Sequence, residues 1–143
     1  MFHNIGEWRD GWYVVPYDVT LRDLDPFNHV NNAIYLTYFE WARTQYWLRI
    51  TGGSKPSDIN FIVARAEIDF RRQVALERIH IATRIAEMRG SSFDFVYEVR
   101  KEDGQGLAAT GKVVVVLYDW QQQTKVTRSE ELRGRIRAFQ KEE

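Results

Sequence analysis

The stretch from Ala33 to Ile50 constrains the fold more than any other part of this 143-residue chain. Twelve of its 18 residues are apolar, which is too many for a helix that keeps one wet face. Asn31 or Asn32 can cap this helix, and Gly52-Gly53 supplies its stop. The sequence therefore predicts a helix that ends at about Ile50 and that other elements largely wrap.

Alternating residues on both sides of this helix predict strands. The first strand is expected from Gly11 to Leu21, where Pro16 suggests a sheet edge or a bulge. The last two strands are joined by a hairpin turn within Lys101–Gly106, which contains an Asp-Gly pair. The order β-α-β-β-β-β predicts an α+β fold, with a curved antiparallel sheet of about five strands around the helix. The four later strands are expected at Asn60–Phe70, Glu77–Met88, Phe93–Val99 and Leu107–Trp120.

The chain reads as one domain over residues 1–143, with a core at about 11–126, because no repeat or linker divides it. Thr127-Arg128-Ser129-Glu130 can form a capping box. Leu132, Ile136 and Phe139 follow at helical spacing, which predicts a short helix over about 128–140.

Composition excludes several classes of function. The 20 basic and 20 acidic residues give a net charge of zero, which argues against nucleic acid as the main partner. Cysteine is absent, so disulfides, thiolate zinc sites and a cysteine nucleophile are excluded. His3 and His80 have no partner at ligand spacing, so neither a metal nor another cofactor is expected. Met1–Asp10 does not resemble a leader, and no apolar run approaches a membrane span, so we expect a cytoplasmic protein without a membrane partner.

A polar run, Asp23-Leu24-Asp25-Pro26-Phe27-Asn28-His29-Val30-Asn31-Asn32, leads directly into the apolar helix. The first turn of a helix leaves backbone N–H groups unpaired, and these favour an anion or a developing oxyanion. A carboxylate at Asp25, seven residues before Asn32, could lie across a bound carbonyl from such donors. Taken alone, Asp25 before Pro26 also favours a simple turn.

This run resembles the active-site loop of hotdog-fold acyl-CoA thioesterases of the 4-hydroxybenzoyl-CoA thioesterase type. Asp25, His29, Asn32 and Tyr35 fall on the pattern of that loop. The resemblance extends over roughly Tyr17 to Val126. It implies a hotdog fold, a homodimer or homotetramer with active sites between subunits, and hydrolysis of an acyl-CoA to a carboxylic acid and coenzyme A.

The resemblance also implies roles for particular residues. Asp25 would act as nucleophile or general base, and the backbone N–H of Asn32 would bind the oxyanion. His29 has three open roles: a satisfied loop histidine, a residue that orients Asp25, or a contact of the thioester. Tyr35 would bind substrate. Glu87–Phe93 resembles the segment that meets the phosphates of coenzyme A, which implies that Arg89, Ser91 and Ser92 bind substrate.

Several alternatives stay open. Asp23 reads as a solvated or Arg-paired neighbour, and Arg71-Arg72 as a solvated strand end or a basic rim. Glu40 is the reserve catalytic carboxylate, although an ion pair with Arg43 or Arg65 is the simpler expectation. An acyl-ACP thioesterase would use the same site, and a non-catalytic acyl-CoA-binding protein would keep the pocket without needing the carboxylate. A serine hydrolase is disfavoured because no Gly-x-Ser-x-Gly is present.

Overall fold

The computed structural model describes residues 4–102, 104, 106–127 and 130–141. These residues contain seven strands, two α-helices and two short 3-10 helices. The strands are β1 (Glu7–Arg9), β2 (Trp12–Asp18), β3 (Phe61–Phe70), β4 (Arg78–Met88), β5 (Ser92–Lys101), β6 (Leu107–Asp119) and β7 (Thr124–Lys125). The helices are η1 (Leu21–Asp23), α1 (Ile34–Thr51), η2 (Pro56–Asp58) and α2 (Glu130–Lys141).

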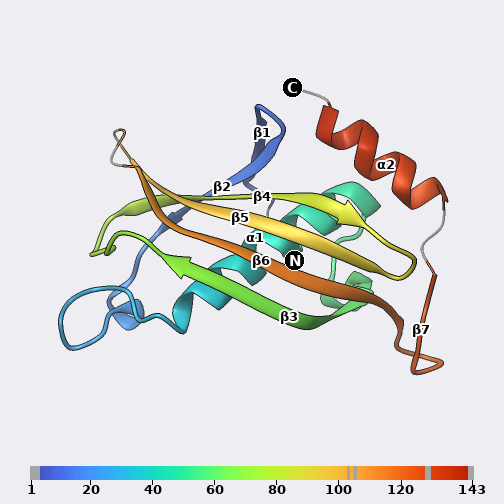
Figure 1. Ribbon diagram of the computed structural model, residues 1–143, viewed down its shortest axis with the longest axis horizontal. Coiled ribbons are helices and arrows are strands. Elements are labelled where there is room, and N and C mark those ends of the chain that lie inside the picture. Colours follow the sequence, from blue (N-terminus) through green and yellow to red (C-terminus); the bar gives the residue numbers. More distant parts are fainter. Residues whose placement is uncertain (1–3, 103, 105, 128–129, 142–143) are drawn as a thin grey trace.

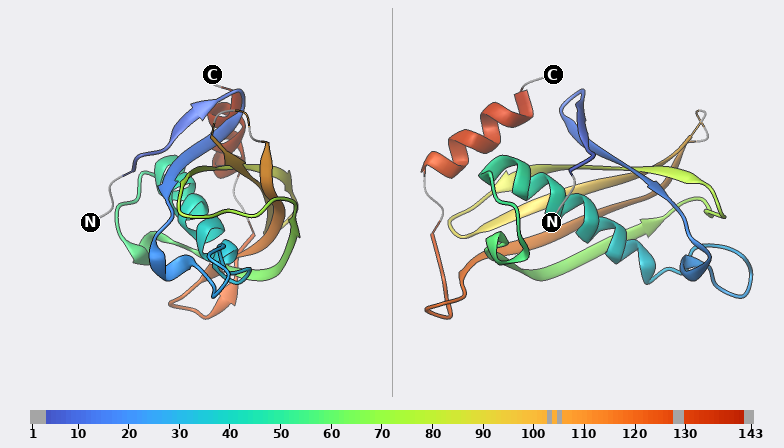
Figure 2. Two further views of the ribbon diagram at one scale, coloured as in Figure 1. Left: turned by 90° about the vertical axis from the view of Figure 1, so that its left-hand side faces the viewer. Right: turned by 180° about the vertical axis from the view of Figure 1, so that it is seen from behind.

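The strands form one antiparallel sheet in the order β1-β2-β4-β5-β6-β3, with β7 beside β6. The sheet curves around α1, as Figure 1 and the left view of Figure 2 show. This confirms the α+β architecture, but the sheet has more strands than the five or so that were expected. The additions are the short β1 and β7. Asp10-Gly11, with φ angles of 51° and 82°, makes the tight turn that pairs β1 with β2, and such a pair is itself a hairpin signal.

Strand β2 ends earlier than expected, because Leu21–Asp23 folds into η1. Pro16 pairs with His80 of β4, whereas β1 pairs only with Trp12–Val14. The other side of β2 therefore has no neighbouring strand at Pro16 among the described residues. Proline has no N–H to donate, and on this open side no strand carbonyl needs one. The expected sheet edge at Pro16 is confirmed.

Helix α1 starts later than the capping prediction placed it. Its N-cap is Ala33, whose side chain makes no cap hydrogen bond, and Asn31 Oδ1 accepts the Ala33 N–H at 2.9 Å just before the helix. At the other end Gly52 adopts a left-handed φ of 77° and donates its N–H to the Leu48 carbonyl at 2.9 Å. The predicted glycine stop is thus confirmed.

Close approach between α1 and the sheet depends on Gly111 of β6. A Cβ added to Gly111 would lie 2.4 Å from the Phe39 ring, so the helix packs against bare backbone there. The Phe39 ring also stacks on Tyr97 of β5, with ring centroids 4.1 Å apart. Both aromatic side chains are buried, and they fix α1 under the middle of the sheet.

Helix α2 packs against α1 and β4. Ile136 is fully buried, and the Phe139 ring stacks on Tyr46 of α1 at 5.9 Å. Gln140 accepts the Ile85 N–H at 2.6 Å and donates to the Ile85 carbonyl at 3.0 Å. Pairing between β2 and β4 ends at Thr83, so the Gln140 side chain takes the hydrogen bonds of Ile85 that a neighbouring strand would otherwise take. Of the predicted capping box, Arg128 and Ser129 lie outside the described residues.

Strand β3 forms the far edge of the sheet, where its sole strand partner among the described residues is β6. Ile62, Val63 and Phe70 on β3 are 37%, 49% and 48% exposed. An apolar, unpaired edge of this kind can pair with a second chain. None of the helices in the described part of the chain has the length and hydropathy needed to cross a membrane.

Candidate active site

The polar run before α1 folds into a narrow loop. Asp25 donates its N–H to the His29 carbonyl at 2.8 Å, and Asn31 donates to the Asp23 carbonyl at 2.9 Å. Leu24 and Val30 form a β-bridge between these two bonds. The tip is closed by Asn28 with a φ of 65°, a left-handed conformation that asparagine tolerates well. The loop is therefore held by its own backbone.

Asp25 has one carboxylate oxygen engaged and one available. Its Oδ1 accepts the N–H groups of Phe27 at 2.9 Å and His29 at 3.2 Å. Its Oδ2 makes no hydrogen bond with any described residue. The turn-forming role and a chemical role are therefore compatible, because one oxygen orients the group while the other is left to meet a ligand.

A hollow of about 380 Å³ lies beside this loop. Its walls include Asp25, His29, Asn32, Tyr35, Arg71 and Arg72. All four residues that match the family loop pattern thus line one hollow. Asp23 does not belong to these walls.

Asn32 presents the donor that the helix start was expected to provide. No described acceptor takes its backbone N–H, whereas the flanking N–H groups of Asn31 and Ala33 are both bonded. Asn32 is exposed and borders the hollow. An N–H without a protein partner, close to the N-terminus of α1, suits a negatively charged oxygen.

Asp23 is neither solvated nor paired with an arginine in the described part of the chain, contrary to expectation. Its side chain is 8% exposed, and its Oδ2 accepts hydrogen bonds from Tyr38 at 2.9 Å, Tyr17 at 3.3 Å and the Thr20 N–H at 3.1 Å. Burial and the neighbouring Asp23 carboxylate raise the pKa of both Tyr38 and Tyr17, so both phenols stay protonated and donate. Asp23 therefore ties the base of the loop to α1 and β2.

Tyr35 and His29 occupy different settings. Tyr35 is buried between Tyr38 and Phe70, and burial, with a smaller effect of Glu77, raises the pKa of Tyr35 to about 12. Its hydroxyl is thus a neutral hydrogen-bond donor. The His29 imidazole forms no hydrogen bond with a described residue, and the bond to Asp25 comes from the His29 backbone.

The segment expected to meet the phosphates of coenzyme A lies elsewhere. The hairpin between β4 and β5, which carries Arg89, Ser91 and Ser92, stands at the opposite end of the sheet from the loop before α1 (Figure 1). Arg89 forms a two-pronged ion pair with Asp94, and its Nε donates to Ser92 Oγ at 2.9 Å. One chain therefore does not bring these three residues into the hollow.

Two features were missed or misjudged from the sequence. Arg71 and Arg72 line the hollow, which favours the basic rim over the solvated strand end. Glu40 forms no ion pair with a described residue, because Arg65 pairs with Glu67 and Arg43 donates to the Tyr97 hydroxyl at 3.3 Å. Glu40 and Arg43 instead border a separate groove of about 240 Å³ between α1 and β3. The sequence gives no sign of this groove, because the apolar pattern of α1 and β3 would look the same if these residues were packed in the core.

Among the described residues, no group of three or more His, Asp or Glu side chains could hold a metal ion. The hollow contributes two such side chains, those of Asp25 and His29.

Comparison with known proteins shows consistent similarities. The family model of the Thioesterase-like superfamily matches residues 19–136. A thioesterase from Thermus thermophilus, crystallised with coenzyme A and zinc, is 34% identical and superimposes with a TM-score of 0.79 over 91% of this chain and 94% of that one. Slr0204 from Synechocystis, a 1,4-dihydroxy-2-naphthoyl-CoA thioesterase, shares the fold, with a TM-score of 0.75, 20% identity and coverage of 87% and 95%. The uncharacterized protein YsmA of Bacillus subtilis (strain 168) is 28% identical over 112 residues, which cover 77% of this chain and 76% of YsmA.

Proposed function

Because this chain belongs to the Thioesterase-like superfamily and is a thioester hydrolase with the hotdog fold, we propose that it hydrolyses acyl-CoA thioesters with Asp25 as its catalytic carboxylate. The observation that carries the proposal is the shared hollow, which Asp25 and Asn32 both line. Asp25 has one carboxylate oxygen, and Asn32 a backbone N–H, that no described residue takes up. A carbonyl held between them would meet a base or nucleophile and an oxyanion donor together. We assign the site to the 4-hydroxybenzoyl-CoA thioesterase type.

The chemistry can follow either of two routes. As general base, Asp25 takes a proton from water while the water oxygen attacks the thioester carbonyl. As nucleophile, Asp25 attacks the carbonyl itself, and water later hydrolyses the mixed anhydride. In both routes the carbon–sulfur bond breaks, the sulfur leaves and takes up a proton as coenzyme A, and the acyl group departs as a carboxylic acid.

The Asn32 N–H stabilises the charge that develops on the carbonyl oxygen. Loss of one such donor typically costs about 100- to 1000-fold in rate. Tyr35, which is neutral, buried and among the walls of the hollow, binds the acyl part of the substrate. His29 borders the thioester, and its backbone N–H orients Asp25.

We further propose that two copies of the chain complete each site. The β4–β5 hairpin, which carries Arg89, and the loop before α1, which carries Asp25, lie at opposite ends of one sheet, whereas β3 has an apolar edge without a second strand among the described residues. When two β3 edges pair antiparallel about a two-fold axis, the Phe61 end of one strand comes beside the Phe70 end of the other. The hairpin with Arg89, Ser91 and Ser92 of one copy then approaches the hollow of its partner and contributes to substrate binding.

The test is a hydrolysis screen of the purified protein over a panel of acyl-CoAs, with release of free thiol as the readout. The same acyl groups are offered on an acyl carrier protein to identify the preferred carrier. We expect turnover that saturates with at least one acyl-CoA. Binding of acyl-CoAs without release of thiol from any substrate would indicate a non-catalytic acyl-CoA-binding protein and would contradict the proposal.

A further inference from the structure

Arg71 and Arg72 stand at the rim of the hollow. They follow the end of β3, and both donate their backbone N–H groups to the Ala108 carbonyl of β6, at 2.8 and 3.1 Å. This shared acceptor turns the chain so that two consecutive arginines border the same space as Asp25. Neither guanidinium forms an ion pair or a side-chain hydrogen bond with any described residue.

Gly106 makes room for one of these side chains. A Cβ added to Gly106 would lie 3.2 Å from Arg72 Nε, so the arginine passes close over the backbone of the turn between β5 and β6. Gly106 has a φ of +86°, a conformation that disfavours a larger residue. The turn therefore holds Arg72 close to the rim without neutralising it.

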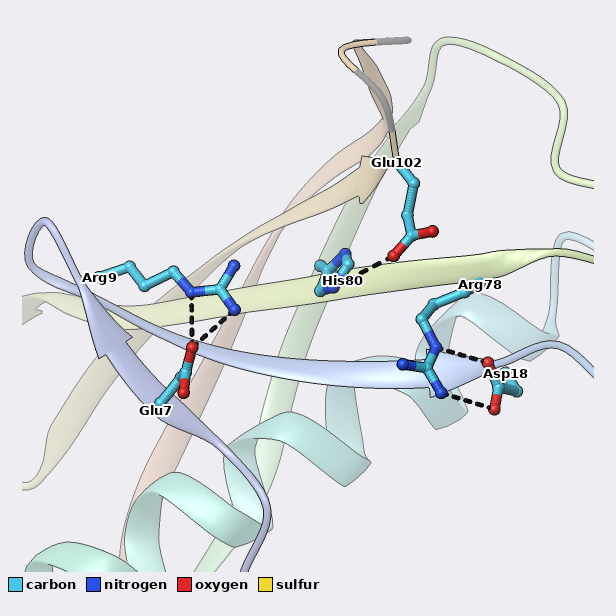
Figure 3. Close-up of polar contacts among 6 residues, drawn as sticks. All are labelled: Glu7, Arg9, Asp18, Arg78, His80 and Glu102. Atoms are coloured by element: carbon cyan, nitrogen blue, oxygen red, sulfur yellow. Dashed lines mark hydrogen bonds and ion pairs between the residues drawn. The ribbon is translucent and has the colours of Figure 1, made fainter.

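Several basic side chains elsewhere on the molecule lie against a neighbouring carboxylate. On the outer side of β1, β2 and β4, Arg9 pairs with Glu7 at 2.6 Å, Arg78 with Asp18 at 2.8 Å and His80 with Glu102 at 3.7 Å (Figure 3). Arg89 pairs with Asp94 in the same manner. Arg71 and Arg72 differ from these residues because no described carboxylate pairs with either guanidinium and both arginines border the hollow that contains Asp25.

We propose that Arg71 and Arg72 form a phosphate-binding site for the carrier of the acyl group, on the same chain as Asp25. The inference rests on the proposed thioesterase function. Guanidinium groups match phosphate oxygens with paired hydrogen bonds, and two adjacent groups suit a pyrophosphate or a phosphodiester. The phosphates of coenzyme A and of a carrier protein's phosphopantetheine arm are both remote from the thioester. This site therefore contributes binding rather than bond breaking.

The experiment compares the parent protein with the double variant Arg71→Gln/Arg72→Gln on three thioesters of one acyl group. The carriers are coenzyme A, phosphopantetheine and N-acetylcysteamine, which has no phosphate. We expect the variant to raise KM for the acyl-CoA about 10-fold with kcat within about twofold, because a remote contact contributes uniform binding. Its kcat/KM for the N-acetylcysteamine thioester should stay unchanged. A matched change, Arg137→Gln on the exposed surface of α2, should affect no substrate.

The phosphopantetheine thioester identifies the source of the phosphate. A raised KM for it assigns the site to the phosphate that both carriers share, whereas a rise for the acyl-CoA alone assigns it to the nucleotide part. Calorimetric titration with coenzyme A provides a readout independent of turnover, and we expect about 10-fold weaker binding to the double variant. If the parent turns over no thioester but the double variant binds coenzyme A more weakly, the proposed function is rejected and the phosphate site is retained. Unchanged KM and unchanged coenzyme A affinity, or equal losses on all three thioesters, would overturn the inference.

Discussion

Tyr38 of α1 donates a 2.9 Å hydrogen bond to the buried carboxylate of Asp23 at the base of the loop before the helix. Two residues further along the chain, Asp25 borders the hollow. The bond therefore joins the loop that carries the proposed catalytic carboxylate to the helix that follows the proposed oxyanion donor. Tyr17 of β2 supplies a second and longer bond of 3.3 Å to the same Asp23 oxygen.

We expect Tyr38→Phe to lower the free energy of unfolding by about 1–3 kcal/mol, because a buried carboxylate oxygen loses its shortest hydrogen bond. Tyr17→Phe should cost less, since its bond is longer and Tyr17 is only half-buried. Urea unfolding of the two variants provides the measurement. An equal or larger loss in Tyr17→Phe would show that Tyr38 is not the main anchor of Asp23.

Gly111→Ala should destabilise the protein by about 1–3 kcal/mol, the usual cost of overpacking. The new Cβ would meet the Phe39 ring at 2.4 Å and the Glu67 carbonyl at 2.9 Å, and the latter is backbone that cannot move aside cheaply. Gly134→Ala is the matched control, because nothing lies within 4 Å of a Cβ at that position of α2. The control should gain about 0.5–1 kcal/mol from better helix propensity. Similar unfolding midpoints in urea for both variants would argue against the close approach of α1 to β6.

Stability should fall between about pH 10 and pH 12. Burial raises the pKa of Tyr35 and of Tyr97 to about 12, while an unfolded tyrosine ionises near 10. The folded state therefore keeps these protons longer, and the stability they contribute is fully present below pH 10 and is lost as the pH approaches 12. Each tyrosine should add a slope of about 1.4 kcal/mol per pH unit in that window.

Urea unfolding at several alkaline pH values measures this slope. Tyr97→Phe should reduce the slope of unfolding free energy against pH by the contribution of one tyrosine, whatever the effect of the substitution on stability at neutral pH. A variant that retains the full slope of the parent would show that Tyr97 does not titrate as its burial requires.

We expect light scattering to give at least a dimer mass at micromolar concentration. Val63→Lys places a charge on the exposed edge of β3 and should produce monomers with reduced acyl-CoA hydrolysis, because charged edge strands resist pairing. Leu76→Lys, at an exposed position in the loop before β4, should leave both mass and activity unchanged. A monomeric parent with full activity would exclude a site shared between copies.

The fold could be predicted where local signals agree. The apolar stretch of α1, its Gly52 stop and the alternation along β3 to β6 each have a single interpretation. The short β1 and β7 were missed because two- and three-residue strands carry no alternation. For β1 the signal lay in the Asp10-Gly11 turn.

The candidate site could be predicted from the sequence only in part. The loop pattern brought Asp25, His29, Asn32 and Tyr35 together, and all four border one hollow. The partners of Asp23 depend on Tyr17 and Tyr38, which tertiary packing brings together from β2 and α1. For Arg71 and Arg72 the sequence left both a solvated strand end and a basic rim open, because the turn that brings them to the hollow depends on long-range bonds to the Ala108 carbonyl. Roles for Arg89, Ser91 and Ser92 stay predictions.

The most direct test of Asp25 as the catalytic carboxylate compares Asp25→Asn with Asp119→Asn. The two aspartates share a local role, since Asp119 Oδ1 accepts the N–H groups of Gln121 and Gln122 at 2.9 and 3.1 Å, much as Asp25 accepts two backbone donors. Asp119 is not among the walls of the hollow.

The measurement is kcat on the best acyl-CoA, after circular dichroism has shown that both variants are folded. We predict a loss of about 100- to 10,000-fold for Asp25→Asn with KM little changed, because an amide is a poor base and a poor nucleophile, and parent-like turnover for Asp119→Asn. Turnover by Asp25→Asn within a few-fold of the parent would contradict the assignment and make Glu40 the next carboxylate to change.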